Sequence, residues 1–250
     1  MSNIIQSLWI GKPLSKLEQL SIQSFIDNGH EYHLYVYDDI QNIPKGTIIK
    51  DANEILNKNE IFYYKNGSVS AFSNLFRFTL LYKKGGYWAD TDLICTKPFH
   101  FKEDFVISSE PDHTYLNTSI NAGLLKFKKN SKEALEGIML QRKQKNDIVN
   151  GNIPWCSGPK TVKAIVEKFN LQEYVLPWNG ICSCHWSDWA SIFNPNYKKN
   201  HNIINDINNI PNDTICIHLW NEVLRRNNIN KDSTFHIDSL FEKYKKKHNI

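Results

Sequence analysis

The apolar and polar positions of this chain change between strand-like and helix-like spacing from the start. Residues 4–10 are rich in β-branched and aromatic side chains, which predicts a strand. Apolar side chains then recur at helical spacing over residues 17–25, and Asn28-Gly29 is expected to end that helix. A second strand is expected at residues 32–37. Strand, helix and strand in this order favour a parallel sheet with right-handed crossovers.

The rest of the chain continues this alternation. A long helix is expected over residues 68–84, because Gly85-Gly86 follows it. A strand is expected to begin near Tyr87 and to continue through Asp90-Thr91-Asp92 to residue 98. Other expected helices cover residues 51–58, 131–145, 159–169 and 235–247, and other expected strands cover residues 105–108, 122–127 and 214–219. The pattern therefore predicts an α/β architecture in one domain.

Composition narrows the class of protein. A chain of 250 residues with 41% hydrophobic residues can build one large core. Its net charge of +4 is too small, and its basic residues too dispersed, to favour a nucleic-acid partner. No run reaches the ~20 apolar residues of a membrane span, and the first residues lack the pattern of a signal peptide, so a cytoplasmic protein is expected. The basic run at residues 243–248 favours a solvated helix end, with peripheral contact at the inner face of a membrane as the alternative.

The five cysteines do not form the pattern of a disulfide framework, because their number is odd and the chain is long. Cys95 and Cys216 lie in apolar runs and are expected in the core. Cys182, Cys184 and His185 lie close together in the sequence, but a structural zinc site needs four ligands and a C-x₂₋₄-C spacing. Zinc is therefore the less favoured interpretation.

Two aspartates at alternate positions, Asp90 and Asp92, are the first candidates for chemistry. On a strand they point to the same face, and carboxylate oxygens are the ligands that Mg²⁺ and Mn²⁺ take alongside substrate phosphates. Chance alone gives about one such pair in a chain of this composition. Here the pair interrupts a strand that otherwise has a buried pattern, and buried charges are normally paired or metal-bound. A metal site is favoured, and two solvated turn aspartates are the alternative.

The preceding helix carries a polar stripe on an otherwise apolar segment. Ser70, Ser73, Asn74 and Arg77 fall at i, i+3, i+4 and i+7, which places them on one face. The planar guanidinium of Arg77 suits a phosphate or a sugar. From periodicity alone, an Arg77 that pairs with an internal carboxylate and holds the helix in place is almost equally favoured.

These motifs together resemble the core of glycosyltransferase family 32, which is related to the glucosylating domains of large clostridial toxins. The resemblance rests on residues 72–77 and 81–92, which are similar to the family pattern SD-x-x-R followed by GG-x-x-x-D-x-D. Matches at residues 8–11, 119–123 and 217–221 extend it over nearly the whole chain. The resemblance implies a GT-A type, Rossmann-like fold with a mixed, mostly parallel sheet flanked by helices. It also implies one catalytic domain, with a nucleotide-sugar-binding half at residues 1–128 and an acceptor side with a closing segment at 129–250.

The resemblance further implies a role for each matching residue. The nucleotide-sugar donor, expected to be a UDP-sugar, would be bound by Trp9, Ser73, Asn74, Arg77, Asp90, Thr91, Asp92 and Trp220. Asp90, Asp92 and His218 would hold Mn²⁺ or Mg²⁺, and the catalytic set would be Asp90, Asp92, Arg77, Asn74 and Asn121. For three of these residues a structural role is the alternative: Asn121 as a turn residue, His218 as a core histidine and Trp220 as a packing residue.

The expected activity is transfer of the sugar to a hydroxyl of a saccharide acceptor, free or lipid-linked, with retention of configuration, in polysaccharide or glycan assembly. Position 74 departs from the family, which usually has Asp there; Asn keeps an acceptor oxygen but loses the charge. A catalytically inactive sugar-binding module and a toxin-like enzyme that modifies a protein are therefore alternatives. Nucleotidyl transfer is disfavoured, because the sequence has no Gly-rich phosphate loop.

Overall fold

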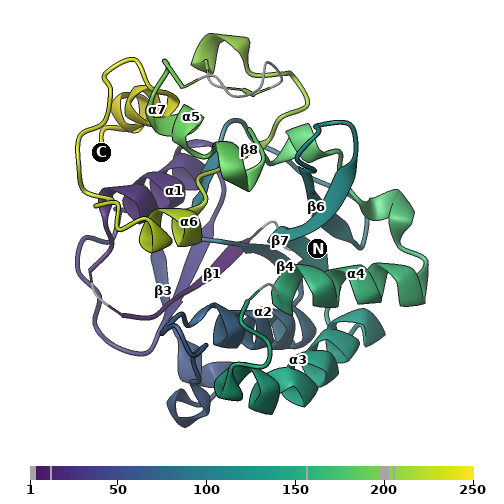
Figure 1. Ribbon diagram of the computed structural model, residues 1–250. Helices are drawn as coiled ribbons and strands as arrows, with labels where there is room; N and C mark the ends of the chain where they lie inside the picture. The colour runs from purple at the N-terminus through teal and green to yellow at the C-terminus, as the bar shows by residue number, and fades with distance from the viewer. Residues whose placement is uncertain (1–3, 12, 156, 198–202, 205) are drawn as a thin grey trace.

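A six-stranded sheet forms the centre of the molecule (Figure 1). The computed structural model describes residues 4–11, 13–155, 157–197, 203–204 and 206–250. The strands are β1 (Ile5–Trp9), β2 (Tyr32–Val36), β3 (Ile48–Asp51), β4 (Gly86–Ala89), β6 (Val106–Pro111) and β7 (Thr118–Phe127). Their order is β3-β2-β1-β4-β7-β6; the pairs from β3 to β4 are parallel, and β7 is antiparallel to both neighbours. The mixed, mostly parallel sheet that was expected is therefore confirmed.

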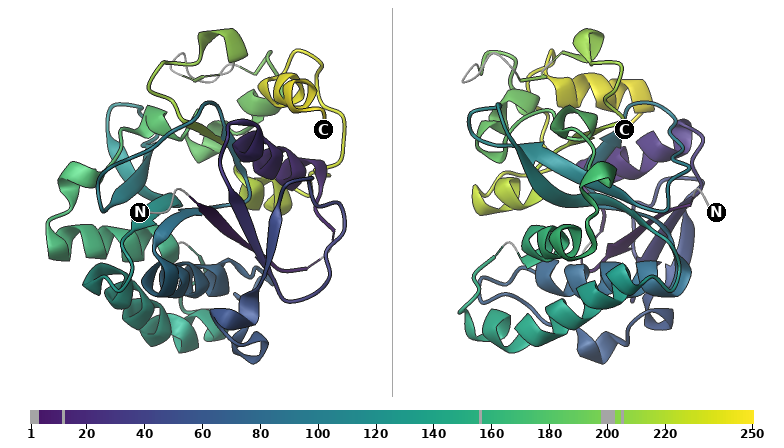
Figure 2. Two further views of the ribbon diagram at one scale, coloured as in Figure 1. Left: turned by 180° about the vertical axis from the view of Figure 1, so that it is seen from behind. Right: turned by 90° about the vertical axis from the view of Figure 1, so that its right-hand side faces the viewer.

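Helices cover both faces of this sheet, as Figure 2 shows. The α-helices are α1 (Lys16–Asp27), α2 (Ser70–Lys84), α3 (Lys132–Asn150), α4 (Ser157–Phe169), α5 (Ala190–Phe193), α6 (Asn221–Arg226) and α7 (Leu240–His248). Short 3₁₀ helices cover Ala52–Glu54, Lys58–Glu60, Gln172–Tyr174, Trp178–Gly180, Trp186–Asp188 and Ile207–Asn209. One hydrophobic core lies between the sheet and α1, α5 and α7, and a second lies between the sheet and α2, α3 and α4. The sheet is thus buried on both faces, which is usual for parallel strands.

A second, two-stranded sheet joins the middle of the chain to its last quarter. Its strands are β5 (Leu93–Cys95) and β8 (Cys216–His218), which run antiparallel with Cys95 opposite Cys216 and Leu93 opposite His218. Cys95 and Cys216 are fully buried, as expected. This pairing decides which residues lie beside Asp90-Thr91-Asp92, because those residues connect β4 to β5.

The end of α2 shows how the sequence fixes the approach to β4. Gly85 has φ of 69°, and a Cβ there would lie 2.7 Å from the backbone nitrogen of Lys129. Only glycine tolerates both the left-handed conformation and this close backbone approach. The chain therefore leaves α2 sharply and enters the sheet next to β1.

Two expected elements were wrong, and the start of a third was misplaced. The helix expected at residues 51–58 is instead the end of β3 and two 3₁₀ turns, because Asp51 and Asn57 each accept a hydrogen bond from the backbone N–H two residues later. The strand expected from Tyr87 to residue 98 breaks at Asp90-Thr91-Asp92 into β4 and β5, which belong to different sheets. The C-terminal helix begins at Leu240 rather than at 235, after the capping residue Ser239. None of the described helices is long and apolar enough to cross a membrane.

Candidate active site

A cavity of about 630 Å³ lies where β1 and β4 end. Trp9 is the last residue of β1, and Asp90 directly follows β4. Because the carboxyl ends of neighbouring parallel strands lie at the same edge, loops there can build a shared site. The cavity is lined by Leu8, Trp9, Ile10, Gly67, Ser68, Val69, Ser70, Ser73, Arg77, Trp88, Asp90, Thr91, Asp92, Asn221, Glu222, Arg225, Asn228, Ile229, Asn230 and Lys231. Residues from the first 92 positions thus meet a segment from the last quarter of the chain.

Asp90 is held by two side-chain donors. Arg77 Nη2 lies 2.7 Å from Asp90 Oδ1, and Trp88 Nε1 donates to the same oxygen at 2.8 Å. Arg77 Nη1 also donates to the carbonyl of Ala122, and its guanidinium lies 4.9 Å from the centre of the Trp88 ring. Burial raises the pKa of Asp90, although the charge of Arg77 opposes this. Arg77 therefore pairs with an internal carboxylate, as the alternative interpretation held, and also lines the cavity.

Asp92 is held by residues that β8 brings to it. Its Oδ2 accepts a hydrogen bond from the backbone N–H of Asn221 at 2.9 Å and lies 3.3 Å from His218 Nε2. Burial alone would raise the pKa of Asp92, but His218 and Asn221 together hold it below its usual value. In the same way, burial would lower the pKa of His218, but Asp92 raises it above its usual value. The two side chains form an ion pair at the back of the cavity.

The carboxylate pair retains oxygens for another partner. No described donor contacts Asp90 Oδ2 or Asp92 Oδ1, and both aspartates line the cavity. Arg225, paired with Glu222, and Lys231, paired with Glu18, also line the cavity, and Lys231 Nζ lies 5.4 Å from the centre of the Trp9 ring. Two hard oxygen donors facing two cations and an aromatic ring fit a divalent ion with an anionic nucleotide. Among the described residues, however, no three His, Cys, Asp or Glu side chains are arranged as a ready metal cluster.

Four of the site residues suggested by the resemblance do not line this cavity. Asn74 is buried and donates to Ser157 Oγ at 3.1 Å. Asn121 donates to Glu110 at 2.7 Å and accepts from the backbone N–H of Gly123. His218 lies behind Asp92. Trp220 stacks on His218 with ring centroids 4.0 Å apart, and only 7% of it is exposed.

The remaining suggested residues are brought together. Trp9, Ser73, Arg77, Asp90, Thr91 and Asp92 all line the one cavity. The cysteines do not add to it: Cys182 and Cys184 are fully buried, and Cys182 Sγ lies 3.9 Å from His218 Nδ1, on the side of the ring away from Asp92. Cys156 lies outside the described residues.

Two family models match the chain. Residues 15–136 match the glycosyltransferase sugar-binding region containing the DXD motif, and residues 151–246 match the alpha 1,4-glycosyltransferase conserved region. The first match contains Ser73, Arg77 and the carboxylate pair, and the second contains the segment that completes the cavity. The chain belongs to the DXD-containing glycosyltransferases.

One solved structure supports the fold of this glycosyltransferase. The glycosyltransferase GlyE of Streptococcus pneumoniae TIGR4 superposes with a TM-score of 0.51 at 14% identity, over 100% of this chain and 61% of that chain. The transferase thus spans about three fifths of the length of GlyE, whose likeness supports the GT-A type fold. The PaToxG glycosyltransferase has a TM-score of 0.49 at 16% identity, over 69% of this chain and 74% of that chain. No curated protein matches the sequence.

Sequence reasoning missed several residues of the transferase site. Glu222, Arg225 and Lys231 line the cavity, but they follow the carboxylate pair by more than 120 positions and stand in no motif. Glu110 contacts Asn121, and burial raises its pKa although the hydrogen bond from Asn121 opposes this. Glu110 is the one charged residue of the buried strand β6, and this was the available signal for it.

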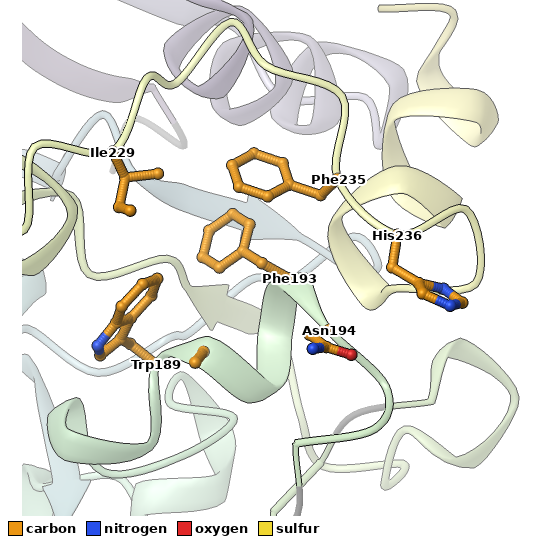
Figure 3. Close-up of a pocket in the computed structure, with 7 residues that line it drawn as sticks. Trp189, Phe193, Asn194, Ile229, Phe235 and His236 are labelled. Carbon is orange, nitrogen blue, oxygen red and sulfur yellow. The ribbon is translucent and has the colours of Figure 1, made fainter.

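A second cavity, of about 290 Å³, lies beside the first and is mostly aromatic. Figure 3 shows Phe193 and Phe235 side by side within it, with Trp189 and Ile229 on one side and His236 on the other. The ring centroids of Phe193 and Phe235 are 4.6 Å apart. Ile229 lines both cavities. The described lining of the smaller cavity carries no carboxylate, whereas the larger one contains Asp90, Asp92 and Glu222.

Proposed function

We propose that this glycosyltransferase transfers a sugar from a nucleoside diphosphate sugar to a hydroxyl of a saccharide acceptor, using Mn²⁺ or Mg²⁺. The observation that carries the proposal is the meeting of Asp90 and Asp92 with Arg225, Lys231 and Trp9 in one cavity. Carboxylates suit a cation, the basic side chains suit a diphosphate, and an aromatic ring suits the stacked base. The choice of UDP, and a place in polysaccharide or glycan assembly, rest on the family resemblance.

The protein residues have distinct tasks in this proposal. Asp90 and Asp92 would hold the metal ion, which when bound neutralises charge on the leaving diphosphate. Arg77 and Trp88 fix the position of Asp90, and Asn221 and His218 fix that of Asp92. Arg225 and Lys231 add a positive field where negative charge develops during transfer.

Retention of configuration is part of the proposal. Of the carboxylates in the described lining, Asp90 and Asp92 are assigned to the metal, and Glu222 is paired with both Arg225 and Arg226. None is left as an enzymic nucleophile in the described part of the cavity. Same-face displacement, in which the leaving phosphate accepts the proton of the acceptor hydroxyl, therefore fits the lining best.

The domain division at residue 128 also stays a proposal, with one refinement. The donor half at residues 1–128 supplies Trp9, the α2 residues and the carboxylates, but the cavity also needs residues 221–231. We assign that segment, rather than the buried Trp220, to closing over the donor. Trp220, which directly precedes this segment, instead packs against the ring of His218.

A panel of UDP- and GDP-sugars tests the proposal. We expect the purified protein to release nucleotide from one of them only when Mn²⁺ or Mg²⁺ is present, and EDTA to stop the release, measured by chromatography of the nucleotide. Asp104→Asn is the matched control for Asp92→Asn, because Asp104 is a half-buried aspartate that is paired with Lys128 and does not line the cavity. If no sugar nucleotide is consumed with either metal, the inactive binding module becomes the better description.

A further inference from the structure

Two exposed tryptophans stand at the edge of the donor cavity. Trp155 precedes α4, and Trp186 begins the 3₁₀ helix Trp186–Asp188; they are 44% and 42% exposed. Their ring centroids lie 6.4 Å apart at an interplanar angle of 80°. In the described part of the chain, neither ring packs into either of the two hydrophobic cores. Their burial therefore contributes little to folding, and another use must explain two large apolar rings in contact with solvent.

A chain of contacts links this tryptophan pair to the donor cavity. The Arg226 guanidinium lies 4.8 Å from the centre of the Trp155 ring, and Arg226 Nε is 3.0 Å from Glu222, which lines the cavity. Trp155 is thus linked through Arg226 to Glu222 in the lining of the cavity.

The chemistry around the rings identifies an occupant. A pyranose has one apolar C–H face, which stacks on an aromatic ring, and a rim of hydroxyls, which need hydrogen-bonding groups. The Trp155 and Trp186 rings lie at nearly a right angle. The Arg226 guanidinium, paired with Glu222, lies over one face of Trp155, and the His185 ring lies 5.1 Å from the Trp186 ring. A protein partner would be expected to need a larger apolar patch than two rings.

We propose that Trp155 and Trp186 bind the saccharide acceptor, as a platform for at least two sugar units, and present its terminal hydroxyl to the donor cavity. This inference rests on the proposed function for the presence of an acceptor, but the binding step can be measured without turnover. The right-angle arrangement favours an oligosaccharide over a single sugar, because each ring offers its surface to a separate unit.

Fluorine NMR tests the binding step directly. The protein is labelled with 5-fluorotryptophan, and the signals of Trp155 and Trp186 are assigned from the variants Trp155→Phe and Trp186→Phe. Maltotriose, cellotriose, lactose and mannobiose are then added in separate titrations. Glucose, galactose and mannose serve as the monosaccharide references. We expect at least one oligosaccharide to shift both signals at a lower concentration than its monosaccharide. If none of these saccharides shifts either signal, the inference is overturned.

Kinetics then test the consequence. With a saccharide that accepts the sugar, Trp155→Ala and Trp186→Ala are each expected to raise its KM about tenfold, the loss expected for one aromatic stacking contact. Trp155→Phe should recover most of the affinity. Met139→Ala is the matched control, because Met139 is 56% exposed on α3, away from the cavity. An unchanged acceptor KM in both tryptophan variants would contradict the inference.

The two proposals fail in different ways. The acceptor platform alone is refuted if the unaltered protein releases nucleotide but no saccharide shifts the Trp155 or Trp186 signal and neither alanine variant changes the acceptor KM. Saccharide-dependent shifts of the tryptophan signals without any nucleotide release refute the transferase mechanism and support the platform.

Discussion

The Arg77–Asp90 ion pair makes Asp90 a structural residue as well as a candidate metal ligand. Arg77 is 4% exposed, and its Nε has no partner among the described residues. Asp90→Ala would leave this guanidinium with the carbonyl of Ala122 as its remaining acceptor. Removing one partner of a fully buried pair costs about 3–5 kcal/mol. Because the Asp90 side chain is 29% exposed, solvent offsets part of this, and we expect a loss of about 2 kcal/mol.

Urea unfolding with EDTA present measures this loss as a shift of the midpoint at constant slope. We expect the double variant Arg77→Met/Asp90→Ala to be more stable than Asp90→Ala, because it no longer holds an uncompensated buried charge. Asp104→Ala, which removes an exposed pair with Lys128, should change stability by less than about 1 kcal/mol. If Asp90→Ala unfolds within about 0.5 kcal/mol of the unaltered protein, or if the double variant is the less stable of the two, this account of the pair is wrong.

Three further predictions follow from the site and the fold. Asp92→Asn should lower metal-dependent nucleotide release at least about a hundredfold, measured by chromatography, and near-normal release would exclude Asp92 as a metal ligand. Without metal, the Asp92–His218 pair should stabilise the fold most between the ordinary pKa values of 3.8 and 6.5. The contribution of Asp92 is lost as pH falls through its lowered pKa, and that of His218 is lost as pH rises through its raised pKa. Thermal melts of the unaltered protein and His218→Asn at pH values below, inside and above this window check it, because the gap between their Tm values should be widest inside the window. A gap that does not change from inside the window to outside it would contradict the prediction. Gly85→Ala should cost about 2 kcal/mol more than Gly29→Ala in urea unfolding, because both have positive φ but only Gly85 meets a backbone atom, and equal losses would refute the steric account.

Local sequence signals predicted the part of the site built by neighbouring residues. The helix that carries Ser73 and Arg77, the glycine break after it and the aspartates beyond all lie within 20 positions, so helical spacing and turn chemistry specify their arrangement. The same reasoning gave the first two strands and the helix between them. It did not reveal that β5 leaves the main sheet, because an apolar run of three residues has the same pattern in either sheet.

Long-range contacts account for what the sequence did not predict. Glu222, Arg225 and Lys231 reach the cavity because β8 pairs with β5, and no periodicity in a single sequence encodes that pairing. The sequence could not decide which group pairs with Arg77 for the same reason. An internal carboxylate and a bound phosphate would both be compatible with the same polar stripe on α2. Asn74, which the family resemblance placed at the donor, instead bonds to Ser157 on α4, whose position follows from packing between α2, α3 and α4.

The pairing of β5 with β8 also sets an order of events during synthesis. A ribosome releases Asp90 and Asp92 long before residues 216–231, and until then Asp92 has neither His218 nor the Asn221 N–H beside it. Lys231, which contacts the buried carboxylate of Glu18 on α1, joins the last part of the chain to the first. A nascent chain can therefore build much of the central sheet, but it gains a charge-balanced cavity only when its final quarter emerges. Premature termination anywhere before residue 216 should leave a folding intermediate without a complete site, in which both aspartates compete for the charge of Arg77.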